Sequence, residues 1–453
     1  MSEKSYHFIA IGGAVMHQLA LHLHNMGHYI TGSDDAIFDP AMTNLKSHGI
    51  FPDELGWFPE RIHNELDAVI LGMHAQQDNP ELLAAQALGI KIYSFPEFVF
   101  EQSKNKKRVV VAGSHGKTTT TSMIMHVLKT AGFNFDYLVG AQIEGFDYVV
   151  KTSIDASCII IEGDEYLTSP LDLRSKFLHY HPHLAIITGI AWDHINVFPT
   201  YPEYVDTFRK FTQSVEDKIF YYYDDKDLQS LAQETKKAEM IAYYPLKTEL
   251  ENDQVYILYQ DKKYPIQIFG EHNMSNLSAA LNICLELGIT AEDFFRHIQS
   301  FKGAAKRMEL LHDNTEQKIT FYKDFAHAPS KVKATVKAIR ERYADRKLII
   351  ALELHTYSSL QKNFIEQYKH SLDAGDVSCV YIDSEALKLK RREPIDSGWL
   401  KEQFGNPQIF VPQDNTGLRD WISEEVTTNS VILLMSSGHW GGLDLKNLYS
   451  ERI

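Results

Sequence analysis

The chain has 453 residues, which is too long for a single hydrophobic core. Its composition, 44% hydrophobic and 23% charged, is that of an ordinary globular protein. The formal net charge of −15 argues against nucleic acid as a partner, because phosphate backbones are bound through clustered Lys and Arg. Apolar runs fall short of the ~18 residues that a membrane span needs, and the polar start MSEKSYHF differs from a signal peptide. We therefore expect a cytoplasmic protein with no membrane partner and with reduced cysteines at Cys158, Cys284 and Cys379.

Strand-like runs alternate with helix-period segments along the first hundred residues. YHFIAIG, HYITGSD, DAVILGM and KIYSF read as strands, while HQLALHLHNMG and PELLAAQALG read as helices. Strands spaced by helices are typical of parallel βαβ units. The polar run QSKNKKR at residues 102–108 precedes a new strand, RVVVAG, so we predict a Rossmann-like domain over residues 1–105.

The α/β alternation continues through the rest of the chain. CIIIEGDE, LAIITGIAWDH and KIFYYYDD come first, followed by an antiparallel pair, VYILYQ and YPIQIFG, turned by DKK. KLIIALEL, VSCVYID, PQIFVP and SVILLMSSG repeat the pattern in the last third. We predict an α/β protein with a central P-loop ATPase-type domain and added hairpin over residues 106–312, and a Rossmann-like domain over residues 313–453.

The segment VVVAGSHGKTTTTSM joins a strand to a helix through a glycine turn. Such a turn points backbone N–H groups and the positive helix end at one spot, where phosphate can bind. Gly113 and Gly116 permit the turn, Lys117 can reach the β/γ-phosphates, and the Thr118 hydroxyl can bind Mg²⁺. The turn is shorter than the Walker pattern, which would have glycine at Val111. A strand–turn–helix with a solvated lysine is the alternative.

Polar residues follow two later strands. The run EGDE begins at Glu162 after CIII, and the segment GIAWDH ends at His194 after LAIIT. The carboxyl ends of parallel strands form the ligand edge of α/β sheets, and Mg²⁺ beside a triphosphate needs hard oxygen ligands. We predict that Glu162 binds magnesium together with Thr118 and that His194 holds a second ion. Each group alone is more often a solvated turn.

An earlier glycine turn lies in HFIAIGGAVM and is followed, about twenty residues on, by Asp34 in TGSD. It imitates the dinucleotide fingerprint G-x-G-x-x-G. That fingerprint would place glycine at Ala10 and Val15, so a nicotinamide site is disfavoured.

The loop G-S-H-G-K-T-T-T resembles that of the Mur ligase superfamily, which comprises ATP-dependent amide-forming ligases of peptidoglycan assembly. EGDE and GIAWDH are similar to the family's E-A-D-E and N-x-x-x-D-H, with Gly189 in place of Asn. The resemblance implies ATP and Mg²⁺ as cofactors, and catalytic roles for Lys117, Glu162 and His194. Several branches of the family also carry a carbamylated lysine. Ungapped counting from the preceding motif places Phe208 of this chain at the position of that lysine. Nucleotide contacts are implied for Gly113, Ser114, His115, Gly116, Lys117, Thr118 and Thr119, and metal contacts for Thr118, Glu162 and His194.

Three further segments resemble family motifs. FGEHNMSNLSAA implies adenine contacts from Asn273 and Asn276, although a capped amphipathic helix would read the same way. FKGAAKRME implies a phosphate contact from Arg307. KDFAHAPS implies that Asp324 lies near the ribose and that His327, a candidate catalytic residue, faces the active cleft.

The resemblance assigns the first glycine turn to the pyrophosphate of a UDP-sugar, a small-molecule substrate. DDAIFDPAMTNLKSHGI, EGDEYLTSPLDLRSKFLHY and MSSGHWGGLDLKNL are similar to the branch that joins UDP-N-acetylmuramate to preformed L-alanyl-γ-D-glutamyl-meso-diaminopimelate through an acyl phosphate. The branch that adds free L-alanine stays open, because it shares this chemistry and lacks the carbamylated lysine. A non-catalytic UDP-sugar binder, motivated by Gly189, and a P-loop kinase are rivals of other classes. The implied substrate contacts are Gly12, Gly13, Ser33, Asp34, His74 and Arg174. For His74 a surface-loop histidine is the more common alternative.

Overall fold

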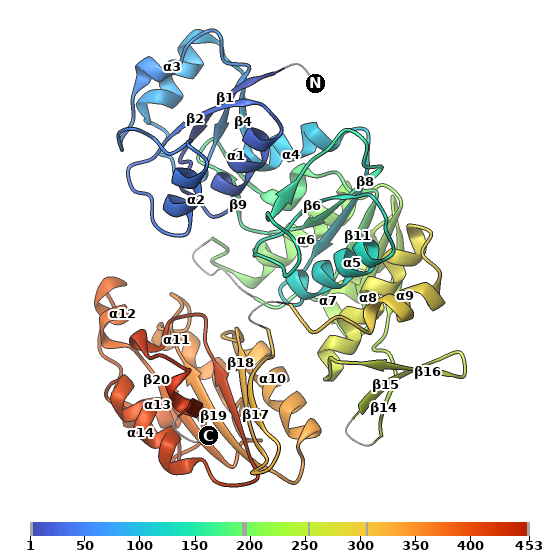
Figure 1. The fold of residues 1–453 in the computed structure, drawn as a ribbon, viewed down its shortest axis with the longest axis vertical. Helices are drawn as coiled ribbons and strands as arrows, with labels where there is room; N and C mark the ends of the chain where they lie inside the picture. The colour runs from blue at the N-terminus through green and yellow to red at the C-terminus, as the bar shows by residue number, and fades with distance from the viewer. Residues whose placement is uncertain (1–2, 193–196, 252–253, 305–306, 451–453) are drawn as a thin grey trace. The chain divides into compact units, whose positions relative to one another are not determined.

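The structure is a computed structural model that describes residues 3–192, 197–251, 254–304 and 307–450. Backbone contacts divide the chain into two compact units, residues 1–244 with 275–298 and residues 245–274 with 299–453. The predicted α/β class is confirmed, since parallel sheets alternate with helices along the chain (Figure 1). Within the described ranges, none of the helices combines the length and the apolar character required to traverse a bilayer.

The first sheet of the first unit is parallel, with strand order β2-β1-β3-β4. Phe8 and Ile70 on its strands are fully buried, together with Leu19 of the helix that follows β1. Ile9 pairs with Ser33, so the glycine turn after β1 and the Ser-Asp pair at the end of β2 lie side by side. The elements are β1 (Ser5–Ile9), α1 (Met16–Asn25), β2 (Tyr29–Ser33), α2 (Ala41–Ser47), η1 (Pro59–Arg61), β3 (Ala68–Leu71), α3 (Pro80–Leu88), β4 (Ile92–Ser94) and α4 (Phe95–Ser103).

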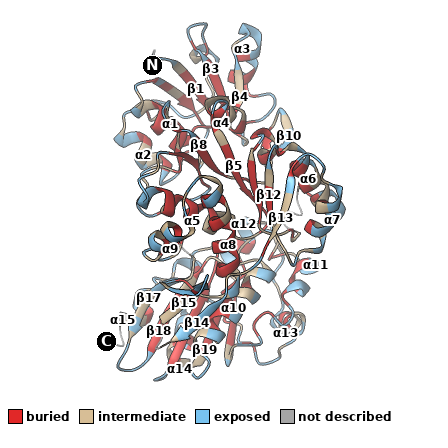
Figure 2. Ribbon diagram, turned by 90° about the vertical axis from the view of Figure 1, so that its right-hand side faces the viewer, coloured by how far each residue is buried: buried red, intermediate tan, exposed pale blue. Residues whose placement is uncertain are grey.

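The second sheet of the first unit has the strand order β13-β12-β11-β5-β8-β6-β7 and is parallel except for β7. β5 lies at its centre between β11 and β8, and these strands are buried apolar runs, as expected when helices cover both faces (Figure 2). The strands are β5 (Lys107–Ala112), β6 (Asp136–Leu138), β7 (Val150–Lys151), β8 (Cys158–Glu162), β11 (Leu184–Ile187), β12 (Lys218–Tyr222) and β13 (Glu239–Tyr243). The other elements are α5 (Lys117–Thr130), hairpin β9 (Leu167–Ser169) and β10 (Asp172–Ser175), η2 (Lys176–His179), α6 (Tyr201–Ser214), α7 (Lys226–Glu234), α8 (Glu271–Glu286) and α9 (Ala291–Ile298).

The second unit contains a small antiparallel sheet and the C-terminal sheet. The predicted pair forms β15 and β16, and a third strand, β14, was missed because its sequence TELE lacks an apolar alternation. Phe269 follows β16 and packs edge-on against Tyr322 of the C-terminal sheet, with ring centroids 6.0 Å apart. The predicted three-domain boundaries stay a prediction.

The C-terminal sheet has the order β17-β18-β21-β19-β20, in which only β17 is antiparallel among the described strands. The strands of this unit are β14 (Thr248–Glu251), β15 (Gln254–Tyr259), β16 (Lys262–Ile266), β17 (Glu309–Asn314), β18 (Ile319–Asp324), β19 (Lys347–Glu353), β20 (Val377–Tyr381) and β21 (Ser430–Met435). Its helices are α10 (Pro329–Arg342), α11 (Lys362–Ile365), η3 (Glu366–Tyr368), α12 (Ser384–Leu389), α13 (Ser397–Phe404), α14 (Asn415–Glu425), η4 (Trp440–Gly442) and α15 (Asn447–Ser450).

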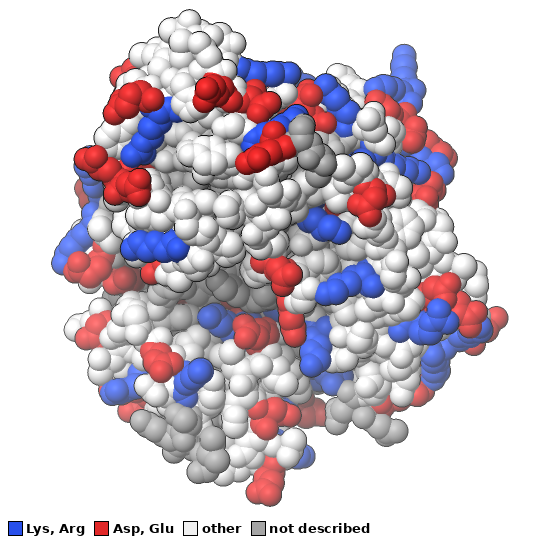
Figure 3. All heavy atoms as spheres, turned by 45° about the horizontal axis from the view of Figure 1, so that its top comes forward, with Lys and Arg blue, Asp and Glu red and all other residues white. Residues whose placement is uncertain are grey.

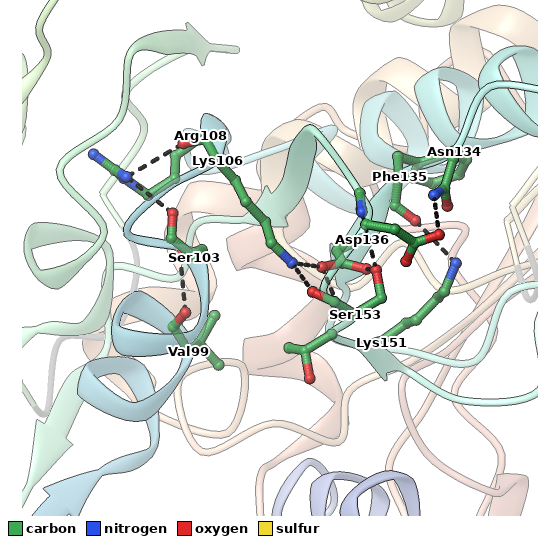
Figure 4. A network of polar contacts seen from close by, with 12 residues as sticks. Val99, Ser103, Lys106, Arg108, Asn134, Phe135, Asp136, Lys151 and Ser153 are labelled. Atoms are coloured by element: carbon green, nitrogen blue, oxygen red, sulfur yellow. Dashed lines mark hydrogen bonds and ion pairs between the residues drawn. The ribbon is translucent and has the colours of Figure 1, made fainter. Parts of the chain in front are cut away.

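A buried polar network lies where the chain leaves α4 and enters β5 (Figure 4). Lys106 forms an ion pair with Asp136 and also donates to the Ser153 carbonyl. Ser153 donates to the same carboxylate through its backbone N–H at 2.9 Å and its hydroxyl at 2.8 Å. The Arg108 guanidinium donates to the Ser103 carbonyl at 3.0 Å. The polar run between the first two sheets is therefore anchored by buried charges that each have partners.

Replacing Asp136 with alanine should lower the free energy of unfolding by about 3–5 kcal/mol, because the buried Lys106 ammonium loses its counter-charge. Chemical denaturation of the variant and the wild type measures this loss. Asp420→Ala is the matched control, because Asp420 pairs with Arg419 on the surface and its loss should cost less than about 1 kcal/mol. Equal losses in the two variants would contradict the prediction.

Candidate active site

The phosphate loop lies between β5 and α5 at the carboxyl edge of the seven-stranded sheet. Gly113 has a φ of 121° and Gly116 a φ of 78°, in the region that favours glycine. A Cβ added at Gly113 would lie 2.3 Å from Thr188 Oγ1, and one at Gly116 would lie 2.3 Å from Asn276 Oδ1. Both positions therefore require glycine. The structure also brings the predicted adenine-binding residue Asn276 against this loop.

Lys117 opens α5 and is held by two oxygen partners. Its Nζ donates to the Gly113 carbonyl at 2.6 Å and forms an ion pair with Glu165 at 2.8 Å. Glu165 is fully buried and also accepts from the Tyr204 hydroxyl at 3.1 Å. Burial by itself would lower the pKa of Lys117, but Glu165 and the neighbouring acidic side chains outweigh it and raise that pKa. The lysine is therefore a fixed cation beside the loop.

Sequence reasoning missed Glu165, the acidic partner of Lys117, and Tyr204, which donates to Glu165. Glu165 ends the EGDE run and could have been found from its place after a buried strand. Tyr204 comes from α6 and carries no motif that would reveal its contact.

Thr118 and Glu162, the two predicted magnesium ligands, are in direct contact. The Thr118 hydroxyl donates to Glu162 Oε1 at 2.7 Å, and the Gly140 N–H donates to Oε2 at 2.9 Å. The contact follows from strand pairing, because β8 is next to β5 and Glu162 is in register with Val111. Both are hard oxygen ligands and so fit Mg²⁺. The remaining predicted ligand, His194, lies outside the described residues.

Gly189, which stands where the family usually has Asn, has a φ of 139° that L side chains rarely adopt. Its carbonyl accepts from the Ser114 N–H at 2.9 Å. The next N–H groups are also bound, that of Ile190 by Asp225 at 2.6 Å and that of Ala191 by the Ser114 hydroxyl at 2.8 Å. The departure from the family pattern therefore has a backbone reason, and the segment is tied to the phosphate loop without the Asn.

The first glycine turn is fixed by residues that were predicted to face the UDP-sugar. Asp34 Oδ2 accepts from the Gly12 N–H at 2.8 Å, and burial raises the pKa of this carboxyl. The Ser33 hydroxyl accepts from Arg61 at 2.9 Å, and Gly13 continues the same turn. Asp34 thus holds the turn in shape. Arg61, which sequence reasoning missed, adds a positive charge beside it.

The other two predicted substrate contacts lie elsewhere in the first unit. His74 is exposed in the segment that follows β3. Arg174 is exposed on β10, where its Nε lies 3.0 Å from each carboxylate oxygen of Asp172. Within the described residues neither side chain donates to the glycine turn.

In the second unit, Asp324 ends β18 and is almost fully buried. Its carboxylate accepts from the N–H groups of Met308 and Ala326, both at 2.6 Å. Asn273, the other predicted adenine contact, donates to the Phe269 carbonyl at 2.8 Å. In this structure both side chains therefore bind the backbone that surrounds them.

Arg307 and His327 meet at one aromatic ring. The Arg307 guanidinium lies over the Phe325 ring, 4.8 Å from its centroid. His327 Nδ1 lies 2.7 Å from the Phe325 carbonyl, and its ring packs edge-on against the same side chain. The two predicted site residues of the second unit are therefore neighbours.

A polar cluster that sequence reasoning missed lies at the carboxyl edge of the C-terminal sheet; we call Glu353, His355 and Lys390 the C-terminal polar cluster. Glu353 is 1% exposed, and its Oε2 accepts from the Ser436 hydroxyl and, at 3.0 Å, from the Trp440 N–H. Glu353 Oε1 and His355 Nδ1 lie 3.7 Å apart and are buried without hydrogen-bond partners among the described residues. Lys390 Nζ donates to the His355 carbonyl at 2.6 Å. Unpaired buried polar atoms at the ligand edge of a parallel sheet indicate a place for a polar ligand.

The surface charge of the protein is mixed. Acidic and basic side chains are interspersed on the face drawn in Figure 3. Lys117 is set apart from the surface lysines by its position on the phosphate loop and by its buried partner Glu165.

A short glycine-rich phosphate loop, with a lysine and a threonine opposite the carboxylate of the neighbouring strand, defines a nucleotide-using α/β enzyme of the P-loop type. The chain belongs to the Mur ligase family, whose members are ATP-dependent amide ligases of peptidoglycan synthesis that act on small molecules. It matches the Mur ligase family, catalytic domain, over residues 5–107, the Mur ligase middle domain over residues 111–284, and the Mur ligase, glutamate ligase domain over residues 306–438. The resemblance drawn from the motifs is confirmed.

Relatives and solved structures cover nearly the whole chain. A UDP-N-acetylmuramate–L-alanine ligase of Limosilactobacillus reuteri is 31% identical over 395 residues, which are 84% of this chain and 85% of the relative. A murein peptide ligase of Psychrobacter arcticus is 23% identical, with a TM-score of 0.62 over 98% of each chain. A UDP-N-acetylmuramate–alanine ligase of Thermotoga maritima is 19% identical, with a TM-score of 0.68 over 96% of each chain. These two structures share the fold of the chain.

Replacing Gly113 with alanine should weaken nucleotide binding at least about tenfold, a loss of about 1.4 kcal/mol. The added Cβ would lie 2.3 Å from the Thr188 hydroxyl and 2.7 Å from its backbone nitrogen, so the loop must shift. Calorimetric titration with ADP measures the affinity. Gly132→Ala is the control, because Gly132 also has a positive φ but its added Cβ would meet nothing within 4 Å. A folded Gly113→Ala protein with unchanged ADP affinity would show that the loop does not bind phosphate.

Proposed function

We propose that the protein uses ATP and Mg²⁺ to join the carboxylate of UDP-N-acetylmuramate to the amine of L-alanyl-γ-D-glutamyl-meso-diaminopimelate. The observation that carries the nucleotide chemistry is the contact between Thr118 and Glu162 beside Lys117. The similarity of three segments to the peptide-adding branch supports the peptide as acceptor. The structural likeness to a murein peptide ligase and to an alanine ligase, each over nearly the whole chain, fits either acceptor.

The proposed reaction has two steps. A carboxylate oxygen of the sugar attacks the γ-phosphorus of ATP, the bond to the β-phosphate oxygen breaks, and ADP leaves an acyl phosphate. The amine nitrogen then attacks the acyl carbon, inorganic phosphate leaves, and the nitrogen gives up its proton to solvent. Lys117 neutralises the charge on the transferring phosphoryl group. One Mg²⁺ held by Thr118 and Glu162 and a second ion held by His194 would supply further charge neutralisation.

The UDP-sugar is assigned to the first sheet. The turn at Gly12 and Gly13 leads into α1, and glycines at such a turn let a pyrophosphate approach the backbone closely. Asp34 positions this turn through the Gly12 N–H, and Arg61 lies on the neighbouring Ser33. We assign the pyrophosphate to this turn, with His74 and Arg174 as further contacts to the sugar.

The amine substrate is assigned to the C-terminal polar cluster. A buried carboxylate oxygen without a hydrogen-bond partner, as in Glu353, matches an ammonium group, and Lys390 matches a carboxylate. A peptide acceptor carries both kinds of charge. The neighbouring pair Arg307 and His327 belongs to the same unit and is assigned to the nucleotide and the reacting groups.

Free L-alanine is the second candidate amine. The relative from Limosilactobacillus reuteri, 31% identical to this chain, is named for L-alanine. Phe208 occupies the position at which several branches carry the carbamylated lysine. Because the alanine-adding branch lacks that lysine, Phe208 also favours L-alanine as the amine. The chemistry at Lys117 would be the same with either amine.

Mass spectrometry of the products separates the two amines. The enzyme is supplied with UDP-N-acetylmuramate, ATP and Mg²⁺, together with either L-alanine or the tripeptide at equal concentration. We expect the tripeptide adduct to form with the higher kcat/KM. If product forms with L-alanine but not with the tripeptide, the amine substrate is L-alanine and the peptide assignment is wrong.

The same assay tests where the amine binds. Glu353→Gln should raise the KM for the amine about tenfold or more, with the KM for ATP unchanged, because a neutral amide replaces the charge opposite an ammonium. Glu385→Gln is the matched control, since Glu385 is 69% exposed and pairs with Lys388 on the surface. Equal increases in the KM values for ATP and for the amine would argue against the assignment.

Replacing Lys117 with alanine should lower the rate of UDP-N-acetylmuramate-dependent ADP release by about 10²–10³, the cost of removing one electrostatic stabiliser. A coupled ADP assay at saturating substrates measures this rate. Lys129→Ala, in the last turn of the same helix, should retain the wild-type rate. Near-wild-type turnover in Lys117→Ala would remove the lysine from the chemistry.

A further inference from the structure

Three side chains of metal-ligand type meet in the first unit, where α4 packs against η2 and the hairpin β9–β10. Glu97 lies in the first turn of α4, Asp172 begins β10 and His179 ends η2. One donor atom of each lies within 4.8 Å of the donor atoms of the other two. None of the three belongs to the phosphate loop or to its predicted magnesium ligands.

The histidine of this group is in an unusual state for a buried polar residue. The His179 side chain is only 4% exposed, and its Nε2 is buried without a hydrogen-bond partner among the described residues. Asp172 Oδ2 lies 3.4 Å from this nitrogen. A buried ring nitrogen left unpaired costs free energy unless a ligand uses it. Nε2 therefore faces the Asp172 carboxylate with its hydrogen-bonding capacity unused.

The two carboxylates are oriented by other side chains. Ser94 holds Glu97 Oε2 through its backbone N–H at 2.8 Å and its hydroxyl at 2.7 Å. Arg174 contacts both oxygens of Asp172 through its Nε at 3.0 Å. The Ser94 contacts fix the direction of Glu97, as outer partners do for metal ligands. Arg174 also places a positive charge beside the cluster, where it competes with any cation.

We propose that Glu97, Asp172 and His179 form a second metal site, distinct from the magnesium site of the phosphate loop, for a divalent ion of the zinc class. One imidazole nitrogen and two carboxylate oxygens suit Zn²⁺ or Co²⁺ better than Mg²⁺, which prefers oxygen ligands. The ion ties α4 of the first sheet to the hairpin and η2 that follow β8. Its binding displaces the Arg174 guanidinium from Asp172.

Titration of the full chain with Co²⁺ and Zn²⁺ tests the site. The protein is first stripped with a chelator and then kept in excess Mg²⁺ and ADP, so that the phosphate loop is filled. We expect visible absorption from a single bound equivalent of Co²⁺, which Zn²⁺ then displaces. His179→Gln should weaken Co²⁺ binding about 100-fold, since loss of a ligand exceeds the 10–100-fold typical of an outer partner. His370→Gln, at an exposed histidine paired with Asp373, should leave the titration unchanged.

A second variant keeps the test decisive if His179→Gln folds poorly. Arg174→Gln changes an exposed side chain and removes the positive charge that competes with the metal for Asp172. We therefore expect it to strengthen Co²⁺ binding about tenfold, which corresponds to about 1.4 kcal/mol. Weaker or equal binding in Arg174→Gln would overturn the proposal. Unchanged Co²⁺ spectra in a folded His179→Gln protein would also overturn it and place the metal elsewhere.

Discussion

The hydrogen bond from the Thr118 hydroxyl to the Glu162 carboxylate joins the ends of two neighbouring parallel strands. β5 delivers the phosphate loop and β8 delivers the carboxylate, so the pairing of these strands sets the distance between the two groups. The glycines of the loop allow the close approach, because larger residues at Gly113 or Gly116 would collide with their neighbours. The nucleotide chemistry proposed for this enzyme depends on that arrangement.

Much of the fold could be predicted from the sequence. The parallel sheets follow from apolar runs alternating with helix-period segments, and the loop at Lys117 follows from glycine, lysine and hydroxyl residues at one strand–helix junction. Gly12 and Asp34 were predicted to face a ligand, and the structure shows that their contact also fixes the turn. Local patterns were sufficient here because the signal and the contact lie on adjacent segments.

Contacts between distant segments could not be predicted in this way. Tyr204 reaches Glu165 from α6, and Arg61 reaches Ser33 from the short 3-10 helix η1, which has no pattern of its own. The C-terminal polar cluster depends on which strands are neighbours in the sheet, and strand order cannot be deduced from a single sequence. The sequence shows only that Gly189 departs from the family's Asn, whereas the φ of 139° at this residue gives a backbone reason for glycine.

The ion pair between Lys117 and Glu165 gives the lysine of the loop a counter-charge before any nucleotide binds. A triphosphate that binds Lys117 competes with the Glu165 carboxylate for the same ammonium group. When the nucleotide leaves, the ammonium still has Glu165 as its counterion. In the proposed cycle this pairing would stabilise the empty loop and so weaken the retention of ADP. An enzyme that must exchange its nucleotide at every cycle benefits from a loop whose cation is never without a counterion.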